Sequence, residues 1–165
     1  MSANTETCDG GCGCGSVRYR VELEPLIVHC CHCRWCQRQT GSAFAVNALF
    51  EATRVSLLAG EVEVIDTPSP SGNGQVITRC PDCRVAVWSS YHMGGLKERI
   101  RFIRVGTLDN PDRLPPDVHI YTTTKQPWVV LPPDDYAVDE FYDIKATWRP
   151  DSLERRAALA RAMKA

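Results

Sequence analysis

The sequence lacks a basic excess and any long apolar run, and these two absences argue against two classes of partner. Lys and Arg number 19 against 20 for Asp and Glu, which gives a formal net charge of -1. Proteins that grip phosphate backbones usually carry a clear positive balance. No apolar stretch approaches the roughly 18 residues that span a bilayer. We therefore expect neither a nucleic acid nor a membrane as a partner.

The first residues are polar and also lack the apolar segment of a secretory signal, so we expect a cytoplasmic protein. With 165 residues, of which 44% are hydrophobic and 24% charged, the chain has the composition of one globular domain. It shows no repeat and no low-complexity tract. We predict a flexible arm at residues 1–10, a metal-binding domain at 11–145 and a helical tail at 146–165.

The nine cysteines are the most informative residues. An odd number without a secretory signal does not suit a disulfide framework. Seven of them fall into three closely spaced groups: Cys12 with Cys14, then Cys31, Cys33 and Cys36, then Cys80 with Cys83. Such spacings let thiolates converge on one ion and are the usual mark of zinc. Of the two left over, we interpret Cys30 as a buried thiol and Cys8 as an exposed thiol on the arm.

Seven thiolates divide most simply into a set of four and a set of three. Structural zinc is closed by four protein ligands, whereas catalytic zinc keeps three and leaves one position open. Spacing alone does not decide the pairing, because Cys33, Cys36, Cys80 and Cys83 would make an equally acceptable closed site. Cys30 or Cys8 could also complete the triplet as a second closed site.

Short strands separated by Gly and Pro predict a mainly β fold. We expect strands at residues 17–23, 26–28, 44–50, 55–58, 62–66, 75–79, 85–89, 100–105, 119–122 and 128–131. In this assignment Trp88 and Trp128 pack in the core. Residues 34–40 predict a short helix that ends at Gly41. A second helix, at 152–164, is expected to lie on the body of the protein, with partner binding or dimer swapping as the alternative.

Three segments together carry a resemblance to a known family: Gly11-Cys-Gly-Cys-Gly-Ser-Val-Arg-Tyr19, Cys31-His-Cys-Arg-Trp-Cys-Gln-Arg38 and Thr40-Gly-Ser-Ala-Phe44. Further matches follow at Cys80-Pro-Asp-Cys83, Gly106-Thr-Leu-Asp109, His119-Ile-Tyr121 and Gln126-Pro-Trp128. The sequence resembles the glutathione-dependent formaldehyde-activating enzymes, a family that also includes centromere protein V. The similarity covers roughly residues 10–143.

This resemblance implies a β-tent of antiparallel sheets with two zinc ions. By analogy, a structural zinc is held by Cys12, Cys14, Cys80 and Cys83, and an open zinc by Cys31, Cys33 and Cys36. One departure concerns the second knuckle, where the family usually has Gly after the last cysteine and this chain has Arg84. A left-handed turn would favour Gly there, so we expect a locally different geometry.

An open three-thiolate zinc would bind a substrate thiolate and present its sulfur to an aldehyde. We therefore expect a carbon-sulfur lyase acting on an adduct of the S-hydroxymethyl type, formed from glutathione or another small-molecule thiol. Cys31, Cys33, Cys36 and His32 are the candidate catalytic residues. Arg34, Trp35 and Arg38 are the candidate substrate-binding residues. The alternative is a non-enzymatic, zinc-stabilised binding module, and the sequence is compatible with a homodimer.

Overall fold

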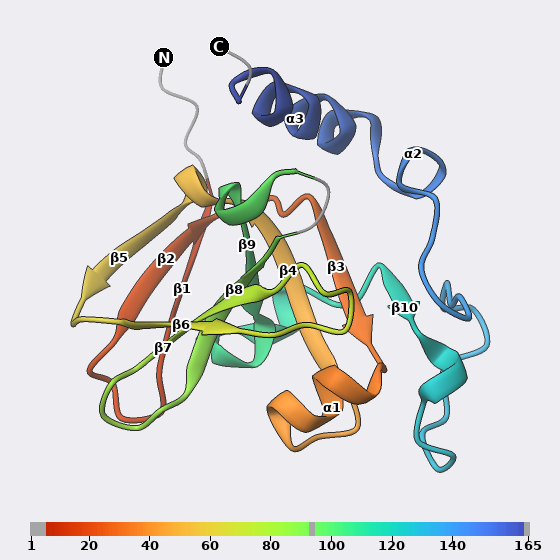
Figure 1. Cartoon of the computed structure of the whole chain (residues 1–165), viewed down its shortest axis with the longest axis horizontal. Helices are drawn as coiled ribbons and strands as arrows, with labels where there is room; N and C mark the ends of the chain where they lie inside the picture. Colours follow the sequence, from red (N-terminus) through yellow and green to blue (C-terminus); the bar gives the residue numbers. More distant parts are fainter. Residues whose placement is uncertain (1–5, 93–94, 164–165) are drawn as a thin grey trace.

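The computed structural model describes residues 6–92 and 95–163, which form two β-sheets and three α-helices (Figure 1). The predicted mainly β class is confirmed. No helix in this described part of the chain has the length and hydropathy to cross a membrane. The strands are β1 (Thr7–Gly11), β2 (Arg18–Glu22), β3 (Ile27–Cys31), β4 (Ala45–Glu51), β5 (Val55–Ala59), β6 (Glu63–Thr67), β7 (Gln75–Arg79), β8 (Ala86–Tyr91), β9 (Ile100–Arg104) and β10 (Val118–Ile120). The α-helices are α1 (Arg34–Thr40), α2 (Ile144–Thr147) and α3 (Pro150–Arg161), and short 3-10 turns lie at Ala52–Arg54, Lys97–Arg99, Val105–Thr107, Pro111–Arg113 and Thr122–Thr124.

The larger sheet has the strand order β10-β3-β4-β9-β8-β7-β6, and the smaller has the order β1-β2-β5. Neighbouring strands are antiparallel except for β10, which runs parallel to β3. Figure 1 shows the small sheet on one side of the molecule and β10 on the opposite side, with α1 directly after β3. This arrangement brings the β3–α1 connection next to residues that follow much later in the chain.

The central strands β3 and β4 are buried on both faces, so alternate side chains supply two separate cores. Val28 and Phe50 pack into one core, which contains the predicted core residue Trp88. Ile27 and Leu49 pack into the other, which α2 and α3 help to cover. The large sheet therefore separates two environments in which different chemistry can be placed.

Residues 7–10 of the predicted N-terminal arm belong to a strand. Residues 7–11 form β1, which pairs with β2 along its whole length. Arg20 of β2 donates two hydrogen bonds to the Asp9 carboxylate, at 2.6 and 2.8 Å. Cys8 is only 6% exposed. The prediction of an exposed Cys8 on a mobile segment is wrong, because alternation along β1 turns this thiol toward the core. The first five residues of the arm lie outside the described residues.

The strand predicted at residues 128–131 does not form. The backbone turns here, since the N–H of Val129 donates to the carbonyl of Gln126 at 3.0 Å. Trp128 is 71% exposed and therefore does not pack in the core as predicted. Prolines at positions 127 and 132 lack the N–H groups that a sheet ladder needs, which outweighs the strand preference of the apolar residues between them.

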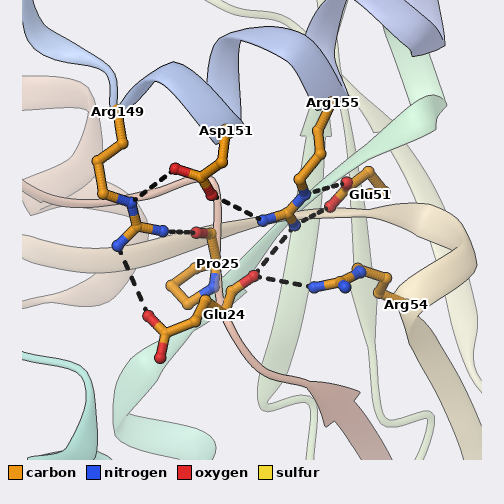
Figure 2. A network of polar contacts seen from close by, with 7 residues as sticks. All are labelled: Glu24, Pro25, Glu51, Arg54, Arg149, Asp151 and Arg155. Carbon is orange, nitrogen blue, oxygen red and sulfur yellow. Dashed lines mark hydrogen bonds and ion pairs between the residues drawn. The ribbon is translucent and has the colours of Figure 1, made fainter. Parts of the chain in front are cut away.

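The C-terminal helix is docked on the body by a network of polar contacts (Figure 2). Arg155 donates to both oxygens of Glu51, at 2.6 and 2.5 Å. Arg149 donates to the carbonyl of Pro25, and both Arg155 and Arg54 donate to the carbonyl of Glu24. The expected helix on the body is thus confirmed, although it begins at Pro150 rather than Ser152 and α2 straddles the boundary predicted between residues 145 and 146.

Candidate metal centre and adjoining cavity

Four of the cysteines converge between the two sheets. Cys12 and Cys14 come from the β1–β2 connection, and Cys80 and Cys83 come from the β7–β8 connection. Their sulfur atoms all lie within 4.8 Å of one another. The Cys12 and Cys14 sulfurs are 3.5 Å apart, and those of Cys14 and Cys80 are 3.7 Å apart. The pairing implied by the family resemblance is the one found, whereas the alternative set of Cys33, Cys36, Cys80 and Cys83 is not brought together.

These separations fit a tetrahedral zinc ion. Four sulfurs at about 2.3 Å from zinc are about 3.8 Å apart in a regular tetrahedron. The donor atoms are also prepared for a cation, because the backbone N–H of Val17 donates to the Cys12 sulfur at 3.3 Å. Hydrogen bonding with the Ser16 hydroxyl lowers the pKa of the Cys14 thiol to about 6. The separations of the four sulfurs therefore suit a bound metal ion, although burial raises the pKa of the Cys80 thiol to about 11.

Arg84, the residue that follows the second knuckle, adopts the left-handed conformation with φ of 65°. Its N–H donates to the carbonyl of Cys80 at 3.1 Å, which closes the turn around the thiols. The conformation is therefore the one that favours Gly, and here a side chain with a Cβ occupies it at a cost of about 1–2 kcal/mol. The expectation of a locally different geometry is therefore wrong, because Arg84 adopts the left-handed conformation of a Gly and bears the strain.

Cys31, Cys33 and Cys36 form a second cluster, in which the sulfurs again lie within 4.8 Å of one another. Cys31 ends β3, Cys33 is the N-cap of α1, and Cys36 lies in the first turn. Helix α1 ends as predicted at Gly41, whose φ is 65°. In the described part of the chain neither Cys8 nor Cys30 belongs to this cluster, so it is not completed as a four-cysteine site.

The start of α1 favours negative charge on Cys33, the middle cysteine of this cluster. The N–H of Cys36 donates to the Cys33 sulfur at 3.3 Å. Hydrogen bonds from the Cys31 and Cys36 thiols lower the pKa of Cys33, and backbone N–H groups of Cys36 and Trp35 lower it further. Free N–H groups at a helix start stabilise a thiolate in the same way. The triplet is therefore suited to bind a cation.

The triplet forms part of the wall of a cavity of about 430 Å³. Aromatic side chains from several elements line the same cavity: Trp35, Tyr91, Phe102, Tyr121 and Phe141. By contrast, none of the four clustered cysteines at positions 12, 14, 80 and 83 lines it. A small organic molecule that enters this cavity can reach the three-cysteine cluster.

Two of the three predicted substrate-binding residues lie at this cavity. Arg34 and Trp35 line it. Arg38 lies one turn further along α1 and instead lines a neighbouring hollow, which it shares with Arg34 and Trp128. Arg34 also donates to the side-chain oxygen of Gln37 at 2.9 Å. The exposed guanidinium groups are thus available to an anionic ligand, and their role in binding remains a prediction.

His32, a candidate catalytic residue, is not among the residues that line the cavity. It is fully buried and its Nε2 lies 3.0 Å from Nδ1 of His119. Burial lowers the pKa of His32 to about 4, so its imidazole is neutral at physiological pH. Side chains alternate along an extended chain, which turns His32 away from Cys31 and Cys33. We therefore assign it no proton transfer at the triplet.

Several cavity residues were missed by sequence reasoning. Ser69 and Ser71 lie in the β6–β7 connection and line the cavity. Tyr121 lies just after β10 and has a φ of 58°, a conformation that is uncommon for residues other than Gly. Strained backbone of this kind gathers at functional sites. It could not be found from the sequence because nothing local to Tyr121 demands that conformation.

Comparison with known proteins agrees with this geometry. The family model described as glutathione-dependent formaldehyde-activating enzyme matches residues 7–124, which include all seven clustered cysteines. The chain belongs to this family. Its description fits glutathione-linked activation of formaldehyde, with glutathione as the small-molecule partner of the family.

Other comparisons add less. A search of curated proteins finds no match to this chain. Among solved structures, a Rhodobacter sphaeroides protein from a structural genomics programme is 18% identical, with a TM-score of 0.47 over 61% of this chain and 87% of its own. The formaldehyde-activating family is therefore the comparison that bears on function.

Proposed function

We propose that this protein forms or cleaves the carbon-sulfur bond of an S-hydroxymethyl thiol adduct, with glutathione as the thiol, at the three-cysteine cluster. The observation that carries the proposal is the position of this cluster. Three thiols within 4.8 Å of one another lie in the wall of a 430 Å³ cavity. Three protein donors beside a ligand-sized space are typical of a catalytic rather than a structural zinc site.

Cys31, Cys33 and Cys36 would hold the zinc ion. When bound, such an ion supplies an open coordination position at which a substrate thiol is deprotonated and its sulfur is held. Three cysteine thiolates bring three negative charges, which would reduce the Lewis acidity of the zinc ion. Activation of water would then be weak, and binding of a substrate thiolate is favoured instead. In the addition direction, the substrate sulfur attacks the carbonyl carbon, and the carbonyl oxygen receives the proton released by the thiol. Cleavage reverses the same bonds.

The remaining cavity residues bind and shield the adduct. The aromatic side chains exclude water from the carbon-sulfur bond. The Tyr91 hydroxyl can donate a hydrogen bond to the adduct oxygen, because burial raises the pKa of this tyrosine and keeps its proton in place. Arg34 offers a guanidinium to a substrate carboxylate.

The test is the exchange rate between free glutathione and its S-hydroxymethyl adduct, measured by NMR in mixtures of glutathione and formaldehyde. The wild-type protein is expected to accelerate exchange. Cys36→Ser should abolish the acceleration, because it removes one of the three donors. Cys8→Ser is the matched control, since Cys8 is a buried cysteine outside the metal clusters of the described chain.

The two outcomes separate clearly. Acceleration that depends on Cys36 but not on Cys8 would support the proposal. Two results would contradict it. One is an exchange rate that does not change when wild-type protein is added, and the other is a Cys36→Ser protein that accelerates exchange as much as wild type.

A further inference from the structure

A third group of metal-ligating side chains lies outside both cysteine clusters. It consists of Cys30 in β3, His32 just after β3 and His119 in β10, and the candidate donor atoms lie within 4.8 Å of one another. The parallel pairing of β10 with β3 places His119 directly beside Cys30. This group depends on two segments that are 87 residues apart in sequence, measured from His32 to His119.

All three side chains are more than nine-tenths buried: Cys30 is 2% exposed, His32 0% and His119 8%. The Cys30 sulfur lies 3.5 Å from Nε2 of His32, which in turn lies 3.0 Å from Nδ1 of His119. In a tetrahedral zinc site, a sulfur and a nitrogen ligand are about 3.5 Å apart and two nitrogens about 3.3 Å. Small movements of the imidazole rings would therefore bring the three donors to ligand positions.

The outer partner of His119 adds an independent observation. Nε2 of His119 lies 3.0 Å from the carboxylate of Asp135. Such a carboxylate accepts a hydrogen bond from Nε2–H of the neutral imidazole, and this tautomer has an unprotonated Nδ1 whose lone pair faces His32 and Cys30. A carboxylate that fixes the far side of a ligating imidazole is a regular feature of protein metal sites.

Hydrogen bonding alone does not join all three candidate donor atoms. Nε2 of His32 lies within reach of both the Cys30 sulfur and Nδ1 of His119, and a proton on Nε2 can form a linear hydrogen bond to only one of them. A metal ion placed among the three donor atoms would contact all of them at once.

We propose that Cys30, His32 and His119 form a third metal site, which binds a transition-metal ion such as Zn²⁺ and in which Asp135 orients His119. One thiolate and two imidazoles suit first-row divalent ions that prefer mixed nitrogen and sulfur ligands. The site lies on the opposite face of β3 from Cys31 and does not line the cavity of the proposed reaction. It is therefore separate from that activity.

The experiment counts metal ions on the full-length protein, loaded with Zn²⁺ and freed of excess ion by gel filtration. His119→Gln is expected to hold about one equivalent less than wild type, and Cys30→Ser should show the same loss. His92→Gln and Cys8→Ser are the matched controls, because neither residue belongs to a metal cluster in the described chain. They should keep the wild-type count.

Loading with Co²⁺ gives a second readout, since each thiolate contributes absorption from sulfur-to-metal charge transfer. Asp135→Asn changes a half-exposed side chain and is expected to fold. It should weaken Co²⁺ binding at this site by about 10- to 100-fold.

The count assigned to this site is the difference between wild type and His119→Gln, so the result does not depend on whether the three-cysteine cluster works as proposed. An identical count in these two proteins, with Co²⁺ affinity unaffected by Asp135→Asn, would overturn the inference and leave a hydrogen-bonded group only. If His119→Gln fails to fold, the affinity of the Asp135→Asn protein decides alone.

Discussion

The four-cysteine and three-cysteine clusters use the same residue type, but they connect the chain in different ways. The four cysteines join the β1–β2 and β7–β8 connections, with Cys14 and Cys80 separated by 66 positions in sequence. The three cysteines come from six consecutive residues at the β3–α1 junction. A metal ion at the first cluster would tie two sheets together, whereas one at the second would hold only a local turn beside a cavity. Stability should therefore depend on the first cluster and substrate binding on the second.

The largest expected effect comes from breaking each cluster in turn. Cys80→Ser should destabilise the protein by several kcal/mol or prevent folding, since structural zinc contributes about 10–16 kcal/mol of apparent binding free energy in small domains. Cys36→Ser should leave a cooperatively folded protein. Urea unfolding measured by circular dichroism checks both.

Cys8→Ser is the control for that experiment, because Cys8 and Cys80 are buried in the same core and only Cys80 belongs to a cluster. It reports the cost of a buried serine hydroxyl alone. If Cys36→Ser proved the more destabilising of the two cluster variants, the division of roles between the clusters would be reversed.

A smaller effect on stability is expected from the ion pair that holds α3 on the side of the sheet with the three-cysteine cluster. Helix α3 packs on the core that contains Cys31 and Cys36, and Arg155 holds it through Glu51. Burial alone would raise the pKa of Glu51, but the hydrogen bonds and positive charge of Arg155, together with a backbone N–H and the charge of Arg54, lower it overall. The stability from this pair is therefore present above about pH 4.5, the ordinary value, and is lost as the pH falls through the lower folded-state pKa.

Arg155→Ala should accordingly cost about 2 kcal/mol at pH 7, because it leaves a largely buried carboxylate without its partner. The loss of stability below pH 4.5 should become shallower in this variant. Urea unfolding at a series of pH values measures both effects. An unchanged acid profile would mean that Glu51 does not hold α3.

The smallest expected effect concerns the four-cysteine knuckle. Arg84→Gly should stabilise the protein by less than about 1 kcal/mol, because Gly removes the left-handed strain but adds freedom to the unfolded chain and loses the exposed pair with Glu63. Thermal melting of Arg84→Gly and of Glu63→Gln separates the two contributions. A lower melting temperature for Arg84→Gly than for Glu63→Gln would show that the turn gains nothing from Gly.

Short-range sequence patterns correctly predicted the features that depend on neighbouring residues. The strands with regular alternation, helix α1 and its end at Gly41 follow from short-range preferences, and the three-cysteine cluster follows because its members share one turn. The pairing of Cys12 and Cys14 with Cys80 and Cys83 needed the family resemblance, since spacing permits other sets. Sequence patterns failed where pairing with a distant segment decides the structure. Residues 7–11 are an example, because they form a strand only through pairing with β2.

The group around His119 marks the furthest limit of sequence reasoning. His119 meets Cys30 and His32 only because β10 adds to the edge of the large sheet in parallel with β3. No periodicity in residues 119–122 indicates which strand they will lie beside. The side chains that enclose the cavity were likewise brought together from separate loops and strands.

Strand β3 presents Cys31 to one face and the adjacent Cys30 to the other. A shift of its pairing by a single position would exchange the two thiols between their environments, although every cysteine would still be present in the chain. Pairing with β4 on one side and with β10 on the other fixes the alignment. Insertions and deletions of one residue in this strand should therefore be tolerated far less than substitutions. Each would move the side chains that follow it to the opposite face of the sheet and so separate the thiols from their partners.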